Sequence, residues 1–434
     1  MFHTFGCKLN FAETSSVARI FANEGICRVS GGERPDIIVV NTCSVTELAD
    51  KKCRQTIRSF HRRYPDAAIV VTGCYAQLKP GEVAGLDGVA VVAGNDKKGE
   101  LTNFIRHWLS TRQTEQHVIP SKDIRTYTPS CSRGDRTRYF LKVQDGCDYW
   151  CTYCTIPAAR GRSRSGTVES IVAQAREAAA DGAKEIVITG VNIGDFGKRS
   201  DAPQKETFFD LIRQLDLVEG IERYRISSIE PNLLTDEIIE FCASSRAFMP
   251  HFHIPLQCGS DEVLRLMHRH YDTALFRHKI ERIRALIPDA FIGVDLIVGA
   301  RGETNEEFTR SREFIKSLPI TRLHIFPYSE RPGTKALEIP HTVTQEEKHR
   351  RVNEMLRISE HKMQQFATQF LGTVRPVLLE RGKPGQPMSG FTDNYLKVSV
   401  DAPHELDNTI VPVRLLSLIP TDIGDCHVKA ELAL

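Results

Sequence analysis

The chain has 434 residues, of which 41% are hydrophobic and 26% charged, so it can bury a core, and its length suggests about three domains. The formal net charge is only +2, so the chain is not a strongly basic protein. Any nucleic-acid-binding surface must therefore come from local clustering of Lys and Arg. No apolar run approaches the roughly 20 residues of a membrane span and no signal-peptide pattern is present, so we expect a cytoplasmic protein without a membrane partner.

Residues 1–130 alternate strand-like and helix-like segments. The predicted elements are strands at the opening residues up to Cys7, at 36–43 and at 68–74, with helices at 11–24 and 48–63 between them. Short β-branched apolar runs are typical of buried parallel strands, and the βαβ series predicts a doubly wound parallel sheet. The polar residues 110–135 predict a linker.

Residues 136–370 repeat a strand and then a helix about six times and end in one long helix. The predicted strands are 138–145, 184–190, 223–229, 251–257, 291–298 and 321–328, and the helices include 168–181, 207–217, 273–286, 304–317 and 344–370. A full eightfold barrel needs about 250 residues, whereas the repeat itself spans only some 200, from 136 to 335, so this region predicts an incomplete (β/α)6 barrel. Residues 371–434 are rich in Val, Leu and turn residues and predict a small antiparallel β barrel.

Three of the twelve cysteines follow the first predicted barrel strand directly. Cys147, Cys151 and Cys154 have C-x3-C-x2-C spacing. Three thiolates suit a cubane of four irons and leave one iron open to a small molecule. The alternatives are a zinc site, which would need a fourth ligand, and inert buried cysteines. We favour the iron–sulfur cluster, because the cysteine spacing and the barrel context agree.

This cysteine loop resembles that of the radical S-adenosylmethionine superfamily. The resemblance implies a 4Fe–4S cluster whose open iron binds S-adenosylmethionine, which an electron cleaves to methionine and a 5′-deoxyadenosyl radical. It also implies that Tyr153, between the last two cysteines, contacts the adenine of this cofactor. The incomplete barrel is the fold that the resemblance implies.

A second group of cysteines is dispersed in the first region. Cys7, Cys43 and Cys74 each follow the C-terminal end of a predicted strand. Those ends border one crevice in a parallel α/β sheet, so the three thiols can converge although they are distant in sequence. The alternative is chance burial, because free cysteine is common in protein cores. The residues alone leave these two interpretations open.

The whole chain resembles the methylthiotransferases, which combine an N-terminal domain with three cluster cysteines, a radical core and a C-terminal TRAM barrel. The stretches 6–10, 41–46 and 73–77 resemble the branch that acts on threonylcarbamoyladenosine in tRNA. The resemblance implies domains at 1–130, 136–370 and 371–434. It implies two 4Fe–4S clusters, one held by Cys147, Cys151 and Cys154 and an auxiliary one held by Cys7, Cys43 and Cys74.

The implied reaction is methylthiolation at C2 of N6-threonylcarbamoyladenosine next to the anticodon. One S-adenosylmethionine supplies the methyl group, a second supplies the radical, and the auxiliary cluster carries the sulfur. The implied partners are tRNA, a flavodoxin- or ferredoxin-type electron donor and a sulfur source. Two hypotheses of other classes compete: a methylthiotransferase acting on a protein side chain, and a non-catalytic iron–sulfur or zinc module that binds RNA.

Several residues lie at the ends of the predicted barrel strands, where barrel enzymes carry their chemistry, and Asp295 lies within the fifth strand. The expected cofactor-binding residues are Gly190, Asn192, Ser228, Glu230, Gln257 and Asp295. A hydrogen-bonded structural role is the alternative for each of them. A threonylcarbamoyl group also carries a carboxylate, and burying it unpaired is costly, so its site should present a cation. Arg301 and Arg331, after the last two barrel strands, are the candidates.

Two positions depart from the family pattern, and both concern the substrate pocket. Cys258 stands where serine is usual, and the pair Ala300-Arg301 stands where Phe-Pro is usual. For RNA phosphates, the candidate contacts are a basic helix and the arginines after the cysteine loop: Lys51, Lys52, Arg54, Arg58, Arg62 and Arg63, with Arg160, Arg162 and Arg164.

Overall fold

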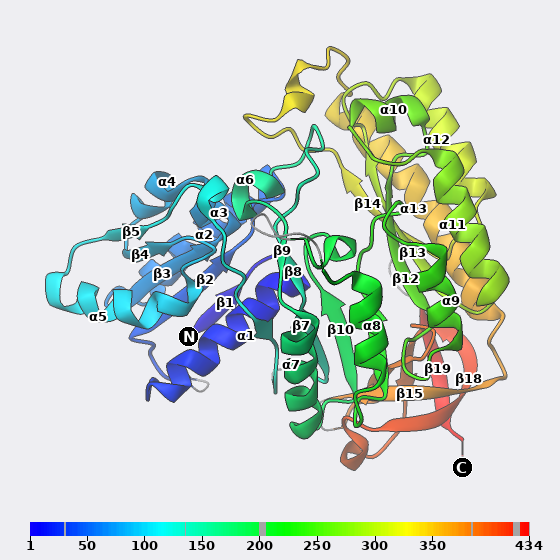
Figure 1. Ribbon diagram of the computed structural model, residues 1–434, viewed down its shortest axis with the longest axis horizontal. Helices are drawn as coiled ribbons and strands as arrows, with labels where there is room; N and C mark the ends of the chain where they lie inside the picture. The colour runs from blue at the N-terminus through cyan, green and yellow to red at the C-terminus, as the bar shows by residue number, and fades with distance from the viewer. Residues whose placement is uncertain (30–31, 135, 199–204, 383–384, 420–425, 434) are drawn as a thin grey trace.

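The computed structural model describes residues 1–29, 32–134, 136–198, 205–382, 385–419 and 426–433 (Figure 1). The N-terminal region forms a parallel sheet in the order β1-β2-β3-β4-β5. Its strands are β1 (Phe2–Thr4), β2 (Ile37–Thr42), β3 (Ala68–Gly73), β4 (Val89–Ala93) and β5 (Glu115–His117). None of the helices in the described ranges combines the length and apolar character that a bilayer span requires.

Helices cover both faces of this sheet, because alternate residues of its apolar strands point to opposite sides. Val39 and Val70 pack with α1 (Lys8–Asn23) and α5 (Leu101–Thr111) on one face. Val40 and Val71 pack on the other face with helices α2 (Glu47–Arg63), α3 (Cys74–Leu78) and α4 (Pro80–Ala84). The prediction of a doubly wound sheet is therefore confirmed.

The central region is an open barrel of six parallel strands. They are β7 (Arg138–Lys142), β10 (Glu185–Thr189), β11 (Arg223–Ile226), β12 (His251–Gln257), β13 (Phe291–Val298) and β14 (Arg322–Pro327). Among the described residues no ladder joins β11 to β12 or β7 to β14, and β11 and β12 are connected by isolated bridges at their flanks, Tyr224 with Phe248 and Ser228 with His253. The prediction of an incomplete barrel is confirmed.

Helices pack on the outside of this barrel around one large hydrophobic core. They are α7 (Val168–Ala180), α8 (Phe208–Asp216), α9 (Asp236–Ser244), α11 (Thr273–Leu286), α12 (Asn305–Ser317) and the long α13 (Gln345–Thr368). The N-terminal sheet lies beside the open side of the barrel (Figure 1). The rings of Phe11 of α1 and Phe140 of β7 meet edge to face, with their centroids 5.8 Å apart.

The C-terminal strands close into a small barrel in the order β15-β16-β17-β19-β18. Its strands are β15 (Val374–Glu380), β16 (Met388–Thr392), β17 (Lys397–Val400), β18 (Ile410–Ile419) and β19 (His427–Leu432). The predicted closure is confirmed, but one pair, β17 with β19, is parallel. Arg223 and Arg225 donate hydrogen bonds to its backbone carbonyls, so the small barrel packs against the end of the central barrel where these strands begin.

The segment predicted as a linker is partly regular structure. β5 completes the N-terminal sheet, and β6 (Ser130–Cys131) pairs antiparallel with β7. A short 3-10 helix, Ser121–Asp123, lies between them. These elements are too short and too polar for a periodic signal, so the linker prediction for 110–135 is wrong where they form.

Candidate active site

A cavity of about 310 Å³ lies at the C-terminal mouth of the central barrel. Its wall combines the radical-loop cysteines, polar strand-end side chains and two residues of the N-terminal region. The lining includes Val45, Thr46, Cys147, Cys151, Tyr153, Cys154, Asn192, Ser228, Glu230, Gln257, Arg269, Asp295 and Phe326. The barrel mouth is where parallel β/α folds bind their ligands, so this cavity is the candidate active site.

The cysteine loop is held tightly in place. Gly146, just before Cys147, has a φ of +70°, and a Cβ there would lie 2.0 Å from the carbonyl oxygen of Arg162. Only glycine fits this position without displacing the backbone. The Cys147 amide donates to the carbonyl of Gly161 at 3.0 Å, which fixes the loop against the turn before Arg162.

The three loop thiols fit an iron–sulfur cluster. They share one cavity wall, and burial raises the pKa of Cys154 to about 12 and that of Cys147 as well. Such thiols stay protonated unless a cation such as cluster iron stabilises the thiolate. Arg269 supplies one fixed charge, because its guanidinium donates to Cys151 Sγ at 3.0 Å.

Most of the polar residues expected to bind the cofactor face the cavity. Asn192, Ser228, Glu230, Gln257 and Asp295 line it, as does Tyr153. Gly190 is not among the lining residues, and a Cβ there would lie 2.9 Å from the carbonyl of Gln144. Its role in the described structure is therefore close packing of the strand end.

Two of these residues carry features that suit a ligand. Asn192 Oδ1 is buried without a hydrogen-bond partner among the described residues, so it can accept from a bound molecule. Gln257 has a φ of +66°, at a register shift in β12. Strain of this kind in a non-glycine residue is typical of functional sites.

Glu230 and Arg269 form a buried ion pair within the cavity. Burial raises the pKa of Glu230, and the Arg269 charge opposes this shift. Sequence reasoning missed Arg269, because nothing in its spacing from the cysteine loop relates it to Cys151; the contact arises only in the folded barrel.

The dispersed cysteines also gather at one edge. In the N-terminal sheet, Asn41 of β2 pairs with Thr4 of β1 and with Thr72 of β3, so Cys7, Cys43 and Cys74 follow their strands at similar levels. A Cβ on Gly6 would lie 3.0 Å from Cys43 Sγ, which brings the Cys7 segment directly against Cys43.

The charges of these three thiols influence one another. Burial raises the pKa of Cys43 to about 11, and the neighbouring Cys74 and Cys7 thiols add to this shift. No three His, Cys, Asp or Glu side chains in the described ranges converge on a single metal ion. A multinuclear cluster needs no such convergence, because each thiolate binds its own iron.

The two cysteine groups face each other across the domain contact. Thr155, next to Cys154, donates through its hydroxyl to the carbonyl of Ser44, next to Cys43, at 3.4 Å. Val45 and Thr46 then line the cavity. The segment that follows Cys43 therefore reaches the cavity, although Cys7, Cys43 and Cys74 are not themselves among its lining residues.

A buried charge network lies behind the two cysteine groups. Arg160 contacts Glu13 and Asp145, each at 3.0 Å through Nη1. The other members are Lys98, Lys142 and Arg164. Four cations thus share two carboxylates, and the positive charges of Arg160 and Lys98 oppose the rise that burial causes in the pKa of Cys74. The excess positive charge suits thiolate ligands at this site.

The structure corrects the expected phosphate contacts after the cysteine loop. Arg160 and Arg164 are buried in the charge network, and only Arg162 is exposed. On α2, Lys51, Lys52, Arg58, Arg62 and Arg63 are exposed, whereas Arg54 binds Tyr75 and Glu82. A local basic surface therefore remains on α2 alone among these candidates.

Neither arginine expected to bind the substrate carboxylate lines the cavity. Arg331 is buried and pairs with Asp50 at 2.9 Å. Arg301 binds Glu330 at 2.7 Å and two backbone carbonyls. The described structure therefore does not support a substrate role for either residue. Cys258 and Ala300 are buried together in a hydrophobic cluster, so these departures from the family pattern are accommodated by packing.

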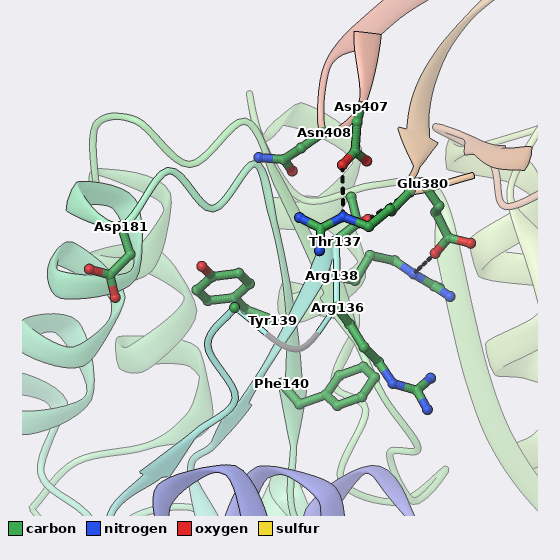
Figure 2. A pocket seen from close by; sticks show the side chains of 11 residues that line it. Arg136, Thr137, Arg138, Tyr139, Phe140, Asp181, Glu380, Asp407 and Asn408 are labelled. Carbon is green, nitrogen blue, oxygen red and sulfur yellow. Dashed lines mark hydrogen bonds and ion pairs between the residues drawn. The ribbon is translucent and has the colours of Figure 1, made fainter. Parts of the chain in front are cut away.

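A second cavity, of about 570 Å³, lies between β7 and the C-terminal barrel (Figure 2). Arg138 of β7 pairs across it with Glu380 of β15 at 3.0 Å, and within the C-terminal region Arg381 pairs with Asp407 at 3.2 Å. None of the sequence-predicted site residues is among those lining it. The chemistry is therefore expected at the first cavity.

Comparison with known proteins agrees with this geometry. A model of the uncharacterized protein family UPF0004 matches residues 1–94, and one of the radical SAM superfamily matches residues 141–315. The chain is 37% identical to the threonylcarbamoyladenosine tRNA methylthiotransferase MtaB of Bacillus subtilis (strain 168), over 96% of this chain and 93% of that protein. MtaB of Aquifex aeolicus (strain VF5) is 34% identical, over 94% and 98% respectively.

A more distant relative has a different named product. The tRNA-2-methylthio-N(6)-dimethylallyladenosine synthase of Thermobifida fusca (strain YX) is 32% identical over 88% of this chain and 77% of that protein. Among solved structures, the radical S-adenosylmethionine methyltransferase TsrM from Kitasatospora setae has a TM-score of 0.51 at 16% identity, covering 76% of this chain and 69% of its own. That likeness concerns the fold alone.

The open six-stranded barrel, with three cysteines in a loop at its mouth, defines a radical S-adenosylmethionine enzyme. The identity along nearly the whole chain narrows this class further. The chain belongs to the threonylcarbamoyladenosine tRNA methylthiotransferase family.

Proposed function

We propose that this protein attaches a methylthio group to C2 of N6-threonylcarbamoyladenosine in tRNA. The observation that carries the proposal is that one three-cysteine group lines the cavity while the segment next to the other group reaches it, through Val45 and Thr46 in its wall and the Thr155–Ser44 hydrogen bond. An enzyme that only cleaves S-adenosylmethionine to a radical would need only one set of three cysteines. The family implies two 4Fe–4S clusters and S-adenosylmethionine as cofactors.

The proposed division of roles follows the two groups. Cys147, Cys151 and Cys154 hold the radical cluster, and Cys7, Cys43 and Cys74 hold the auxiliary cluster. Bound together, the clusters and S-adenosylmethionine supply a carbon-centred radical, a methyl group and sulfur. Tyr153, Asn192, Ser228, Glu230, Gln257 and Asp295 orient the cofactor from the cavity wall, with Gly190 allowing the strand end to pack closely.

The protein's own contribution is positioning and exclusion of water. The C2 hydrogen of adenine is not acidic enough for a side-chain base, so the site needs no general base aimed at that carbon. The Glu230–Arg269 pair is buried and fixed, which keeps the Cys151 thiolate beside a constant positive charge.

Further features of the proposal concern partners and organisation. We infer a flavodoxin- or ferredoxin-type electron donor, a separate sulfur source and a cytoplasmic location, because the reaction consumes electrons and sulfur and acts on tRNA. We also propose that residues 1–130, 136–370 and 371–434 are the three domains, with the last one contributing to RNA binding.

The decisive experiment is reconstitution with both clusters, followed by nucleoside mass spectrometry of treated tRNA. We expect 2-methylthio-N6-threonylcarbamoyladenosine from tRNA that carries threonylcarbamoyladenosine, and no product from tRNA that carries isopentenyladenosine. Release of 5′-deoxyadenosine without any tRNA product would favour a protein substrate. Absence of 5′-deoxyadenosine would favour a non-catalytic RNA-binding module.

An exposed aromatic side chain at the cavity rim suits an RNA substrate. Phe326 is 50% exposed and lines the cavity. Bases of single-stranded loops stack on such side chains. We therefore expect Phe326→Ala to weaken binding of an anticodon stem-loop by about 1–3 kcal/mol, measured by fluorescence anisotropy. Leu217→Ala is the matched control, since Leu217 is 70% exposed and does not line the cavity. Equal affinities for the two variants would contradict stacking at Phe326.

A further inference from the structure

The substrate carboxylate still needs a cation, and most of the buried and half-buried cations of the barrel and of its contact with the N-terminal region already pair with the protein's own carboxylates. Arg269 pairs with Glu230, Arg331 with Asp50, Arg301 with Glu330, Arg225 with Glu185, Arg138 with Glu380, and Lys98, Lys142 and Arg160 with Glu13. Releasing one of them to a ligand would leave a buried carboxylate unpaired, which is costly.

Lys8 is different. It is half-buried, and it has no hydrogen bond or ion pair with any residue that the structure describes. It is the first residue of α1, directly after the auxiliary-site residue Cys7, which is the N-cap of that helix. Its ammonium group is therefore available to a ligand without the loss of an existing pair.

The orientation of α1 directs Lys8 toward the barrel interior. Phe11 and Ala12 of this helix pack on Phe140 of β7 and Val187 of β10, on the side of these strands opposite to the outer helices. Residues three and four positions apart share one face of a helix. Lys8 therefore lies on the same interior-facing side as Phe11 and Ala12, one turn closer to the cysteines.

The neighbours of Lys8 connect it to the active-site cavity. Burial lowers the pKa of His324 to about 4, and the Lys8 charge is among the smaller causes acting in the same direction. The His324 ring stacks on His253 at 4.9 Å. His253 in turn contacts Asp295 at 2.7 Å, and Asp295 lines the cavity. The Lys8 charge also acts on His251, where β12 begins, and on Tyr395, so it lies inside the barrel and is related to the cavity through His324, His253 and Asp295.

We propose that the Lys8 ammonium binds the carboxylate of the threonylcarbamoyl group and so selects this substrate. This inference rests on the proposed function. In adenine, C2 and C6 flank N1, so C2 and the N6 group attached to C6 lie on the same edge of the ring. A base whose C2 is directed toward the site of Cys7 therefore carries its N6 substituent on the side where Lys8, the next residue, lies. A cation at this place favours a carboxylate over an apolar isopentenyl group.

The test compares two forms of one RNA. An anticodon stem-loop with threonylcarbamoyladenosine is prepared as the free acid and as its methyl ester, which removes the negative charge and keeps the shape. Binding of both is measured by fluorescence anisotropy to the wild type, Lys8→Gln, Lys8→Arg and Lys52→Gln. Lys52 is an exposed lysine of α2, and its replacement controls for a general loss of positive charge.

We expect the wild type, Lys8→Arg and Lys52→Gln to prefer the acid on the order of 10- to 100-fold, and Lys8→Gln to lose this preference. The ratio of the two affinities does not depend on turnover, so it stays informative if Lys8→Gln binds less iron at the neighbouring Cys7. A preference kept by Lys8→Gln, or absent from the wild type, would overturn the proposal. Failure of the proposed function has a different result, namely that the wild type leaves threonylcarbamoyladenosine tRNA unmodified.

Discussion

Cys43→Ala should stop methylthiolation and leave reductive cleavage of S-adenosylmethionine largely intact, whereas Cys151→Ala should abolish both. Cys151 belongs to the loop in the main cavity, where Glu230 and Asn192 face the expected cofactor. Cys43 belongs to the other group, at the edge of the N-terminal sheet. Because the two groups are carried by separate folds, loss of one should leave the other assembled. We expect a drop of at least several orders of magnitude in product for each variant.

Two measurements separate these outcomes, namely chromatography of 5′-deoxyadenosine and mass spectrometry of the tRNA nucleosides. Iron content should fall by about half in each variant, since each of the two proposed clusters contains four irons. Cys27→Ala is the control, because Cys27 is an exposed cysteine of the same N-terminal region with no partner spacing. Methylthio product from Cys43→Ala would show that the auxiliary site is assigned wrongly.

Much of the fold follows from local patterns in the sequence. Parallel strands are buried on both faces, so β3 and β13 are apolar runs, and the predicted ranges 68–74 and 291–298 agree with them within one residue. The parallel pairing of β17 with β19 could not be predicted, because strand order depends on contacts between distant residues. The short strands β5 and β6 offer too few residues for a period.

The candidate site also has a part that the sequence predicts and a part that it does not. The convergence of Cys7, Cys43 and Cys74 follows from a topological rule, since the ends of parallel strands meet at one edge. The partners of a charged side chain follow no such rule. In the sequence, nothing distinguishes Arg331 or Arg160 from any other cation near a strand end. Only the assembled domains bring Asp50 to Arg331 and Glu13 to Arg160.

Arg160→Met should destabilise the protein by about 3–5 kcal/mol, the usual effect of removing one partner from a buried ion pair. Arg160 is 1% exposed, and its two Nη atoms contact Glu13, Asp145 and Asn10. Burial raises the pKa of Glu13, but Arg160, Lys142 and Lys98 outweigh it and hold that pKa well below its ordinary value. Without the guanidinium, Glu13 and Asp145 keep only lysine and Arg164 as ion-pair partners, and the N-terminal region loses the buried bonds of Glu13 and Asn10 to the segment after the cysteine loop.

The measurement is the thermal unfolding midpoint of the apoprotein, together with the iron bound after reconstitution. Arg160→Met should lower the midpoint and reduce the iron held at Cys74, whose thiolate the Arg160 charge favours. Arg160→Lys should recover part of both, since it keeps the charge but loses the planar fork that reaches two carboxylates. Arg162→Met is the control two residues away, at an exposed position. An Arg160→Met protein with the wild-type midpoint and full iron content would mean that the remaining cations suffice, and that the two cysteine groups are held together by packing alone.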